Sequence, residues 1–122
     1  MNLDLLTLAE SYIKSWRIAV DGGAYKGEWT RPLSKKFTLV YAFEPQTAYA
    51  HELVATLSGI TIIRAALMDR PGRGVFVVPP RTAKIPFTDR SATVIRNDGG
   101  DVRIVRLDVY PLDGCGLMKL NV

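Results

Sequence analysis

Two acidic residues and a glycine-rich turn are the residues of this sequence best placed to hold a small polar ligand. Asp21 follows the apolar run Ile18–Val20 and opens the turn Gly22–Gly27, and Glu44 follows the next apolar run, Leu39–Phe43. In an open parallel sheet the carboxyl ends of neighbouring strands face one crevice, so we expect Asp21 and Glu44 at the rim of the same cleft. Carboxylates placed there can accept hydrogen bonds from ammonium and hydroxyl groups.

The order strand, tight turn, helix around Asp21 limits which ligands fit. Glycines permit a sharp turn and the close approach of a ligand, and the following helix points free N–H groups at whatever lies over the loop. A dinucleotide would place a pyrophosphate there, which the Asp21 carboxylate would repel, and Gly22–Gly27 lacks the G-x-G-x-x-G spacing. A ligand with an ammonium group and no phosphate is favoured. S-adenosylmethionine is such a ligand, and its ribose diol suits Glu44.

Two motifs then resemble those of class I S-adenosylmethionine-dependent methyltransferases. The segment Val20–Thr30 looks like their first motif, and Tyr41–Pro45 resembles the A-F-E-P signature of the FkbM-type branch. Weaker likenesses lie at Ala65–Leu67, Arg106–Asp108 and Leu117–Val122. The resemblance covers the family's N-terminal cofactor-binding part. The resemblance implies transfer of the sulfonium methyl group to a nucleophile. By family analogy this nucleophile is a hydroxyl oxygen of a small molecule or sugar. The resemblance identifies no catalytic base.

The resemblance also implies a set of cofactor-binding residues, which lie in the two motifs, in one of the weaker matches and near the chain end. They are Asp21, Gly22, Gly23, Ala24, Tyr25, Gly27, Thr30, Glu44, Pro45, Ala66 and Asn121. The glycine loop would surround the methionine part of the cofactor, with Thr30 near its carboxylate. Glu44 would take the ribose, and Pro45 with Ala66 would flank the adenine.

The chain end departs from the family pattern. The family reads I-K-I-D-V-E-G, whereas Met118–Val122 reads M-K-L-N-V, so Asn121 replaces an acid near the methyl-transfer site and no Glu-Gly pair follows. A truncated form of the family fold, without its C-terminal strands, is therefore expected. An unpaired last strand would leave a sheet edge that favours association with a second copy or another partner.

Two other functions stay open at this point. One is a cofactor-binding module or remnant without turnover, which needs a partner chain or a missing C-terminal segment. The other is a nucleotide- or NAD-binding protein of the same fold class, which Asp21 and the loop spacing disfavour. Methyl transfer by the purified chain would remove the first, and tight NAD binding without S-adenosylmethionine binding would overturn the main hypothesis.

The elements that must position these residues follow from hydrophobic periodicity. We expect one domain over 1–122, an α/β, Rossmann-like three-layer sandwich of the class I methyltransferase type, its sheet mostly parallel with a β-hairpin insertion. Helices are expected over 2–16, 28–36 and 47–57, and strands over 17–21, 38–43, 60–67, 75–78, 94–96, 102–107 and 116–122. A hairpin turn is expected at 97–101, and a loop over the sheet at 81–93.

Composition bounds the class of protein. Of 122 residues 48% are hydrophobic, which excludes a disordered chain, and the net charge of +4 is spread too widely to favour a nucleic-acid partner. The one cysteine, Cys115, cannot form an internal disulfide, and no histidine or cysteine cluster indicates a metal site. No apolar run approaches the roughly 20 residues that span a bilayer, and no basic leader opens the chain. A cytoplasmic protein with a small-molecule acceptor is expected.

Overall fold

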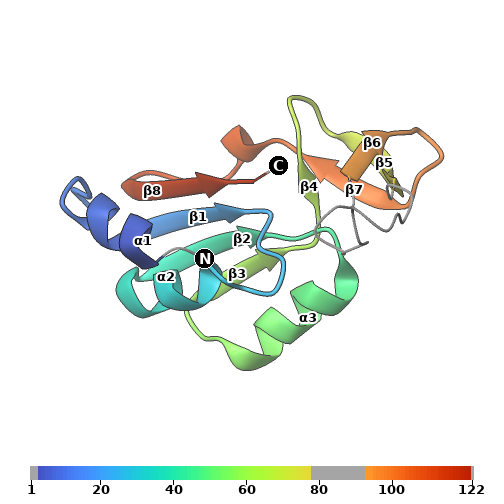
Figure 1. Ribbon diagram of the computed structural model, residues 1–122. Coiled ribbons are helices and arrows are strands. Elements are labelled where there is room, and N and C mark those ends of the chain that lie inside the picture. The colour runs from blue at the N-terminus through green and yellow to red at the C-terminus, as the bar shows by residue number, and fades with distance from the viewer. Residues whose placement is uncertain (1–2, 78–92, 122) are drawn as a thin grey trace, which may run out of the picture.

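A four-stranded parallel sheet is the framework of the chain. The computed structural model describes residues 3–77 and 93–121, and within them this sheet has the order β3-β2-β1-β8. Its strands are β1 (Ile18–Gly22), β2 (Leu39–Phe43), β3 (Ile60–Ile63) and β8 (Cys115–Leu120). They run in the same direction, and Figure 1 shows their arrows pointing toward a second sheet. The predicted α/β class is confirmed, and the strand order is compatible with a Rossmann-like fold.

Helices cover one face of this sheet. They are α1 (Leu3–Glu10), α2 (Thr30–Lys36) and α3 (Thr47–Thr56), which lie on the same side in Figure 1. Leu33 of α2 belongs to one buried cluster with Ala19 and Val40, and Leu53 of α3 packs with Ala42. The steps from β1 to β2 and from β2 to β3 move the same way across the sheet, so right-handed crossovers put α2 and α3 on one face. No helix in the described ranges is long and apolar enough to cross a membrane.

The opposite face is covered by the segment that leads back to β8. Val20 and Phe43 are buried there with Val105, and Tyr110 meets Phe43 edge-on with ring centroids 5.2 Å apart. The return to β8 crosses the sheet in the opposite direction, so a right-handed connection must lie on this face. Within the described residues the third layer of the expected sandwich is therefore a short 3₁₀ turn, Leu107–Val109, with its flanking segments rather than a layer of longer helices.

The second sheet has the order β4-β7-β5-β6 and lies beyond the carboxyl ends of the first (Figure 1). Its strands are β4 (Ala66–Leu67), β5 (Gly72–Val77), β6 (Thr93–Arg96) and β7 (Val102–Val105). The single strand expected over 60–67 is wrong, because β3 ends at Ile63 and β4 belongs to this other sheet. A tight turn separates them, in which the N–H of the fully buried Ala65 donates to the Ile63 carbonyl at 2.9 Å. The run over 60–67 is interrupted only by Thr61 and Arg64 and contains no glycine or proline, so the sequence does not predict such a turn.

The expected hairpin at 97–101 is also wrong. Strands β6 and β7 do not pair with each other, because β5 lies between them and is antiparallel to both. The 97–101 segment crosses over β5 at Gly74, which pairs with Arg96 on one side and Val102 on the other. A Cβ at Gly100 would lie 2.0 Å from the Gly74 carbonyl oxygen, so the crossing requires glycine there. The turn lies where the sequence predicts it, but the strands that it connects have different partners.

Several element boundaries differ from the prediction. Helix α1 ends at Glu10 rather than near 16, because the chain then turns and brings the Ser15 carbonyl against Gly116 of β8. Helix α2 starts at Thr30 and not at 28, and β5 begins at Gly72, before the strand expected over 75–78. The expected loop 81–93 lies outside the described residues except for Thr93, which opens β6.

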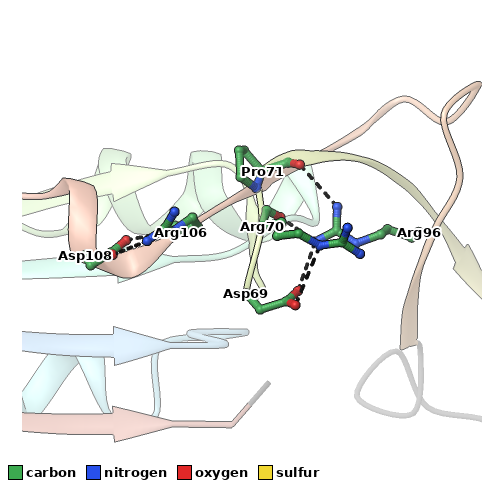
Figure 2. Close-up of polar contacts among 6 residues, drawn as sticks. All are labelled: Asp69, Arg70, Pro71, Arg96, Arg106 and Asp108. Atoms are coloured by element: carbon green, nitrogen blue, oxygen red, sulfur yellow. Dashed lines mark hydrogen bonds and ion pairs between the residues drawn. The ribbon is translucent and has the colours of Figure 1, made fainter.

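Arginine side chains hold the connections of the second sheet. In Figure 2, Arg96 of β6 donates to the Pro71 carbonyl and the Asp69 carboxylate, both at 3.2 Å, and to the Arg70 carbonyl. The pair at the 3₁₀ turn consists of Arg106 and Asp108. Both arrangements are exposed to water, so they orient the connections more than they stabilise the fold.

The crossing over β5 gives a test of the second sheet. Replacing Gly100 by alanine should destabilise the chain by about 1–3 kcal/mol, because the new Cβ overlaps the Gly74 carbonyl and the backbone must shift. Urea denaturation measures the change. Gly99→Ala is the matched control, because its Cβ would meet nothing closer than Asn97 Oδ1 at 3.5 Å, and its effect should stay within about 0.5 kcal/mol. Equal effects of the two variants would contradict the crossing.

Candidate functional site

A cavity of about 340 Å³ opens between the carboxyl ends of β1, β2 and β8 and the second sheet. Its walls come from the glycine loop, the end of β2, the strand β4 and the end of β8. After β1 the chain continues to β2, which pairs with one edge of β1, whereas β8 pairs with the other edge. The cavity therefore lies at the topological switch point of the sheet. Ligands of open α/β sheets bind at such a point, and the volume lies in the usual range for small molecules.

The glycine loop directs its N–H groups into the protein. The N–H groups of Gly23 and Ala24 both donate to the Phe43 carbonyl, at 2.9 and 3.0 Å. The N–H of Tyr25 donates to Glu44 at 2.7 Å, and Tyr25 itself has a φ of 51°, a left-handed conformation that L side chains rarely adopt. Because these donors already have protein acceptors, this part of the loop does not form the cradle of N–H groups that a pyrophosphate requires.

Glu44 is held at the end of β2 by two backbone N–H groups. Its Oε1 accepts from Tyr25 at 2.7 Å and its Oε2 from Gln46 at 2.8 Å. The residue is 3% exposed, and this burial raises the pKa of the carboxyl above its ordinary value of 4.5, while the two N–H bonds act in the opposite direction. A carboxylate has about four lone-pair sites, so Glu44 can still accept hydrogen bonds from two ligand hydroxyl groups in the cavity.

Asp21 is fully buried and joins three elements. Its Oδ1 accepts from the Lys119 ammonium of β8 at 2.9 Å, and its Oδ2 accepts from the Thr30 hydroxyl at the start of α2 at 2.6 Å. Lys119 also donates to the carbonyls of Gly22 and Gly23, at 3.4 and 3.0 Å. The parallel register places Asp21 beside Lys119, so both side chains point to the helix-covered face. This network ties β1, β8 and α2 together at the base of the glycine loop.

Some of the predicted cofactor-binding residues line the cavity: Gly23, Ala24, Tyr25, Glu44, Pro45, Ala66 and Asn121. Others do not line it: Asp21, Gly22, Gly27 and Thr30. Both oxygens of Asp21 and the hydroxyl of Thr30 are engaged inside the protein, so contact of either with a ligand stays a prediction. Gly27, with a φ of 89°, faces α3, where a Cβ would lie 2.5 Å from Leu53. Gly22 ends β1, and its carbonyl accepts from the N–H of Asn121 at 2.9 Å.

Sequence reasoning missed several residues of the cavity wall. Lys119 lies at the end of β8, Trp29 precedes α2, and Phe76 comes from β5. A buried acid needs a cation or hydrogen-bond donors, so an acid at the end of a buried strand is a signal that such a partner lies on a neighbouring element. Nothing in the local sequence identifies β8 as that neighbour. Phe76 lies in a segment without a motif, and only the packing of the two sheets brings it to the cavity.

Neither a metal site nor a known relative assigns a ligand to this cavity. The described ranges contain no group of three or more histidine, cysteine, aspartate and glutamate side chains that could hold a metal ion. In comparisons with known proteins, no family model, curated protein or solved structure matches the chain. The function must therefore be inferred from the fold and from the geometry of the cavity.

The buried ion pair makes a prediction about stability. Lys119→Met should lower the free energy of unfolding by about 3 kcal/mol, because it leaves the buried Asp21 carboxylate without its cation. Adding Asp21→Asn to this variant should restore part of the loss, as urea denaturation would show. Lys36→Met is the control, since Lys36 pairs with Glu10 at the surface and its loss should cost less than about 1 kcal/mol. A loss for Lys119→Met no larger than for the control would contradict this role.

The raised pKa of Glu44 predicts a pH dependence of stability. Because burial places the folded pKa above 4.5, the folded state binds this proton more tightly than the unfolded state. The free energy of unfolding should therefore fall as the pH rises from 4.5 through the folded pKa. Glu44→Gln removes this contribution, so the wild-type-minus-variant difference in free energy should be most positive in acid and decline toward neutral pH. A difference that grows with pH would mean that the bonds from Tyr25 and Gln46 outweigh burial.

Proposed function

We propose that this chain binds S-adenosylmethionine in the cavity at the switch point and belongs to an O-methyltransferase resembling the FkbM type. The observation that carries the proposal is the position of Glu44. It ends β2 at the wall of a cavity of small-ligand size, and two backbone N–H groups fix its carboxylate. An acid fixed at the end of the second strand of such a sheet is suited to a ribose diol.

The charge of the loop fits a cofactor without phosphate groups. Three loop N–H groups are bonded inside the protein, and the Glu44 carboxylate lies next to them on the cavity wall. A pyrophosphate would find no free donors at these positions and would meet a negative charge. This arrangement weighs against the alternative of NAD binding. It suits a ligand that brings hydroxyl groups and a positive charge to the loop.

The remaining wall is suited to an apolar ring. Pro45 follows Glu44 directly, and Ala66 and Leu67 of β4 line the cavity together with Phe76 of β5. Apolar walls with a few convergent polar groups are the usual composition of cofactor sites. In this proposal Glu44 orients the ribose, and the small side chains at 45 and 66 leave room for the adenine.

The chain contributes binding, orientation and exclusion of water, because the bound cofactor would supply the activated methyl group. Glu44 and the apolar wall would hold a cofactor that supplies its methyl group to the acceptor oxygen and leaves as S-adenosylhomocysteine. The acceptor proton passes to a base. We assign no residue of this chain to that step.

A cofactor-binding module without turnover is the second candidate. The observation that favours it is Asn121, which lies on the cavity wall where the resembling family places an acid. An amide side chain does not accept a proton from an acceptor hydroxyl at neutral pH. Methyl transfer from S-adenosylmethionine to any hydroxyl acceptor by the purified chain would exclude this candidate.

Calorimetric titration with S-adenosylhomocysteine tests the binding proposal. Glu44→Ala should weaken binding by about tenfold to a hundredfold, the effect of losing hydrogen bonds to a charged group worth about 1.5–3 kcal/mol. Glu52→Ala on the exposed surface of α3 is the matched control and should leave the affinity unchanged. Absence of binding by the wild-type chain, or binding that the Glu44 variant retains in full, would overturn the proposal. A parallel titration with NAD tests the alternative.

A further inference from the structure

A second hollow adjoins the candidate cofactor cavity and is rich in arginine. This arginine groove has a volume of about 540 Å³ and lies between the end of β3 and the second sheet. Its basic residues are Arg64, Arg73 and Arg103, and Asp101 is its one acid among the described residues. Phe76 lines both hollows, as does Pro45, so the two sites share a wall.

Two of these arginines stand side by side on paired strands of the second sheet. Arg73 of β5 and Arg103 of β7 are directly opposite each other in the antiparallel register, and both are exposed. Among the described residues neither forms an ion pair with a carboxylate, whereas Arg96 and Arg106 in Figure 2 both have one. Like charges directly opposite each other on paired strands are unfavourable, so the Arg73–Arg103 pair does not stabilise the fold.

The surroundings of the pair add positive potential. Arg64 lies on the other wall of the groove, where its guanidinium contacts the ring of His51 at 3.5 Å. Helix α3 begins at Thr47 on the same wall and has no acidic residue in its first turn, and the Glu44 carboxylate that accepts from its N-cap residue Gln46 lines the other cavity rather than the groove. Guanidinium groups bind the oxygens of phosphates and carboxylates in pairs, and an anion between Arg73 and Arg103 would relieve their repulsion.

We propose that the arginine groove binds an oxyanion of the methyl acceptor, so that the acceptor is a small hydroxyl compound carrying a phosphate or carboxylate group. The inference rests on the proposed function. The shared wall at Pro45 and Phe76 sets the geometry, because an acceptor anchored in the groove by its anionic group lies next to the cavity of the cofactor. The groove then determines which acceptors are selected, and the chemistry of transfer stays at the cavity.

Titration of the labelled chain with inorganic phosphate, followed by NMR of the arginine side-chain N–H groups, tests this proposal. The Arg73 and Arg103 signals should shift together with one dissociation constant. Arg73→Gln and Arg103→Gln should each weaken phosphate binding about tenfold, the effect of losing one charge-assisted interaction. The phosphate affinity of Arg73→Lys should lie between those of the wild type and Arg73→Gln, because lysine keeps the charge but loses the planar guanidinium group. Arg106→Gln is the control and should leave the affinity for phosphate unchanged. A parallel titration with acetate distinguishes a phosphate from a carboxylate preference.

The outcomes separate this inference from the proposed function. Phosphate binding that the groove variants retain, or that the Arg106 variant weakens equally, would overturn the groove as a site. S-adenosylhomocysteine titrations on the same samples report on the cavity independently. Cofactor binding without any response of Arg73 and Arg103 to either anion overturns the inference alone. Anion binding in the groove of a chain that does not bind S-adenosylhomocysteine overturns the assignment to a methyl acceptor.

Discussion

The buried contact between Asp21 and Lys119 is the interaction on which the rest of the site depends. It joins residues 98 positions apart in the sequence and brings the last strand beside the first. Asp21 has no exposed surface, so a charge there is tolerated only because the Lys119 ammonium and the Thr30 hydroxyl both contact it. The same ammonium donates hydrogen bonds to the carbonyls of Gly22 and Gly23. The position of the glycine loop, the start of α2 and the edge of β8 are therefore set by one group of polar contacts.

The loop held in this way has a different chemical character from a phosphate-binding turn. Its N–H groups bond to the end of β2, through the Phe43 carbonyl and the Glu44 carboxylate, rather than facing a ligand. The polar group that the cavity then offers is the carboxylate itself, fixed by two donors and with lone pairs remaining. The cavity wall thus carries an acceptor where a phosphate-binding turn carries N–H donors, and this is the physical basis for favouring hydroxyl and ammonium ligands over pyrophosphate.

The second sheet gives the cavity a wall and creates its neighbour, the arginine groove. Its strands come from the segment between β3 and β8, which a right-handed connection must carry across the face opposite the helices. Gly100 allows this segment to cross β5 closely, and the resulting register sets Arg73 opposite Arg103. Phe76 and Arg73 lie on the same strand, β5, and Arg103 lies opposite Arg73 on β7, so a hydrophobic wall stands beside the proposed anion site.

Local patterns in the sequence determined the first two strands, the helix between β2 and β3, and the position of Glu44, because periodicity and turn residues act within a few positions. The sequence also identified the turn at 97–101, but tertiary structure decided that β5 lies between the strands on either side of it. Only tertiary structure divided 60–67 between two sheets and gave Asp21 its partner Lys119. The physical reason is that strand partners and ion pairs form between residues remote in the chain. Their choice depends on which packing buries the most apolar surface and leaves no buried charge unpaired.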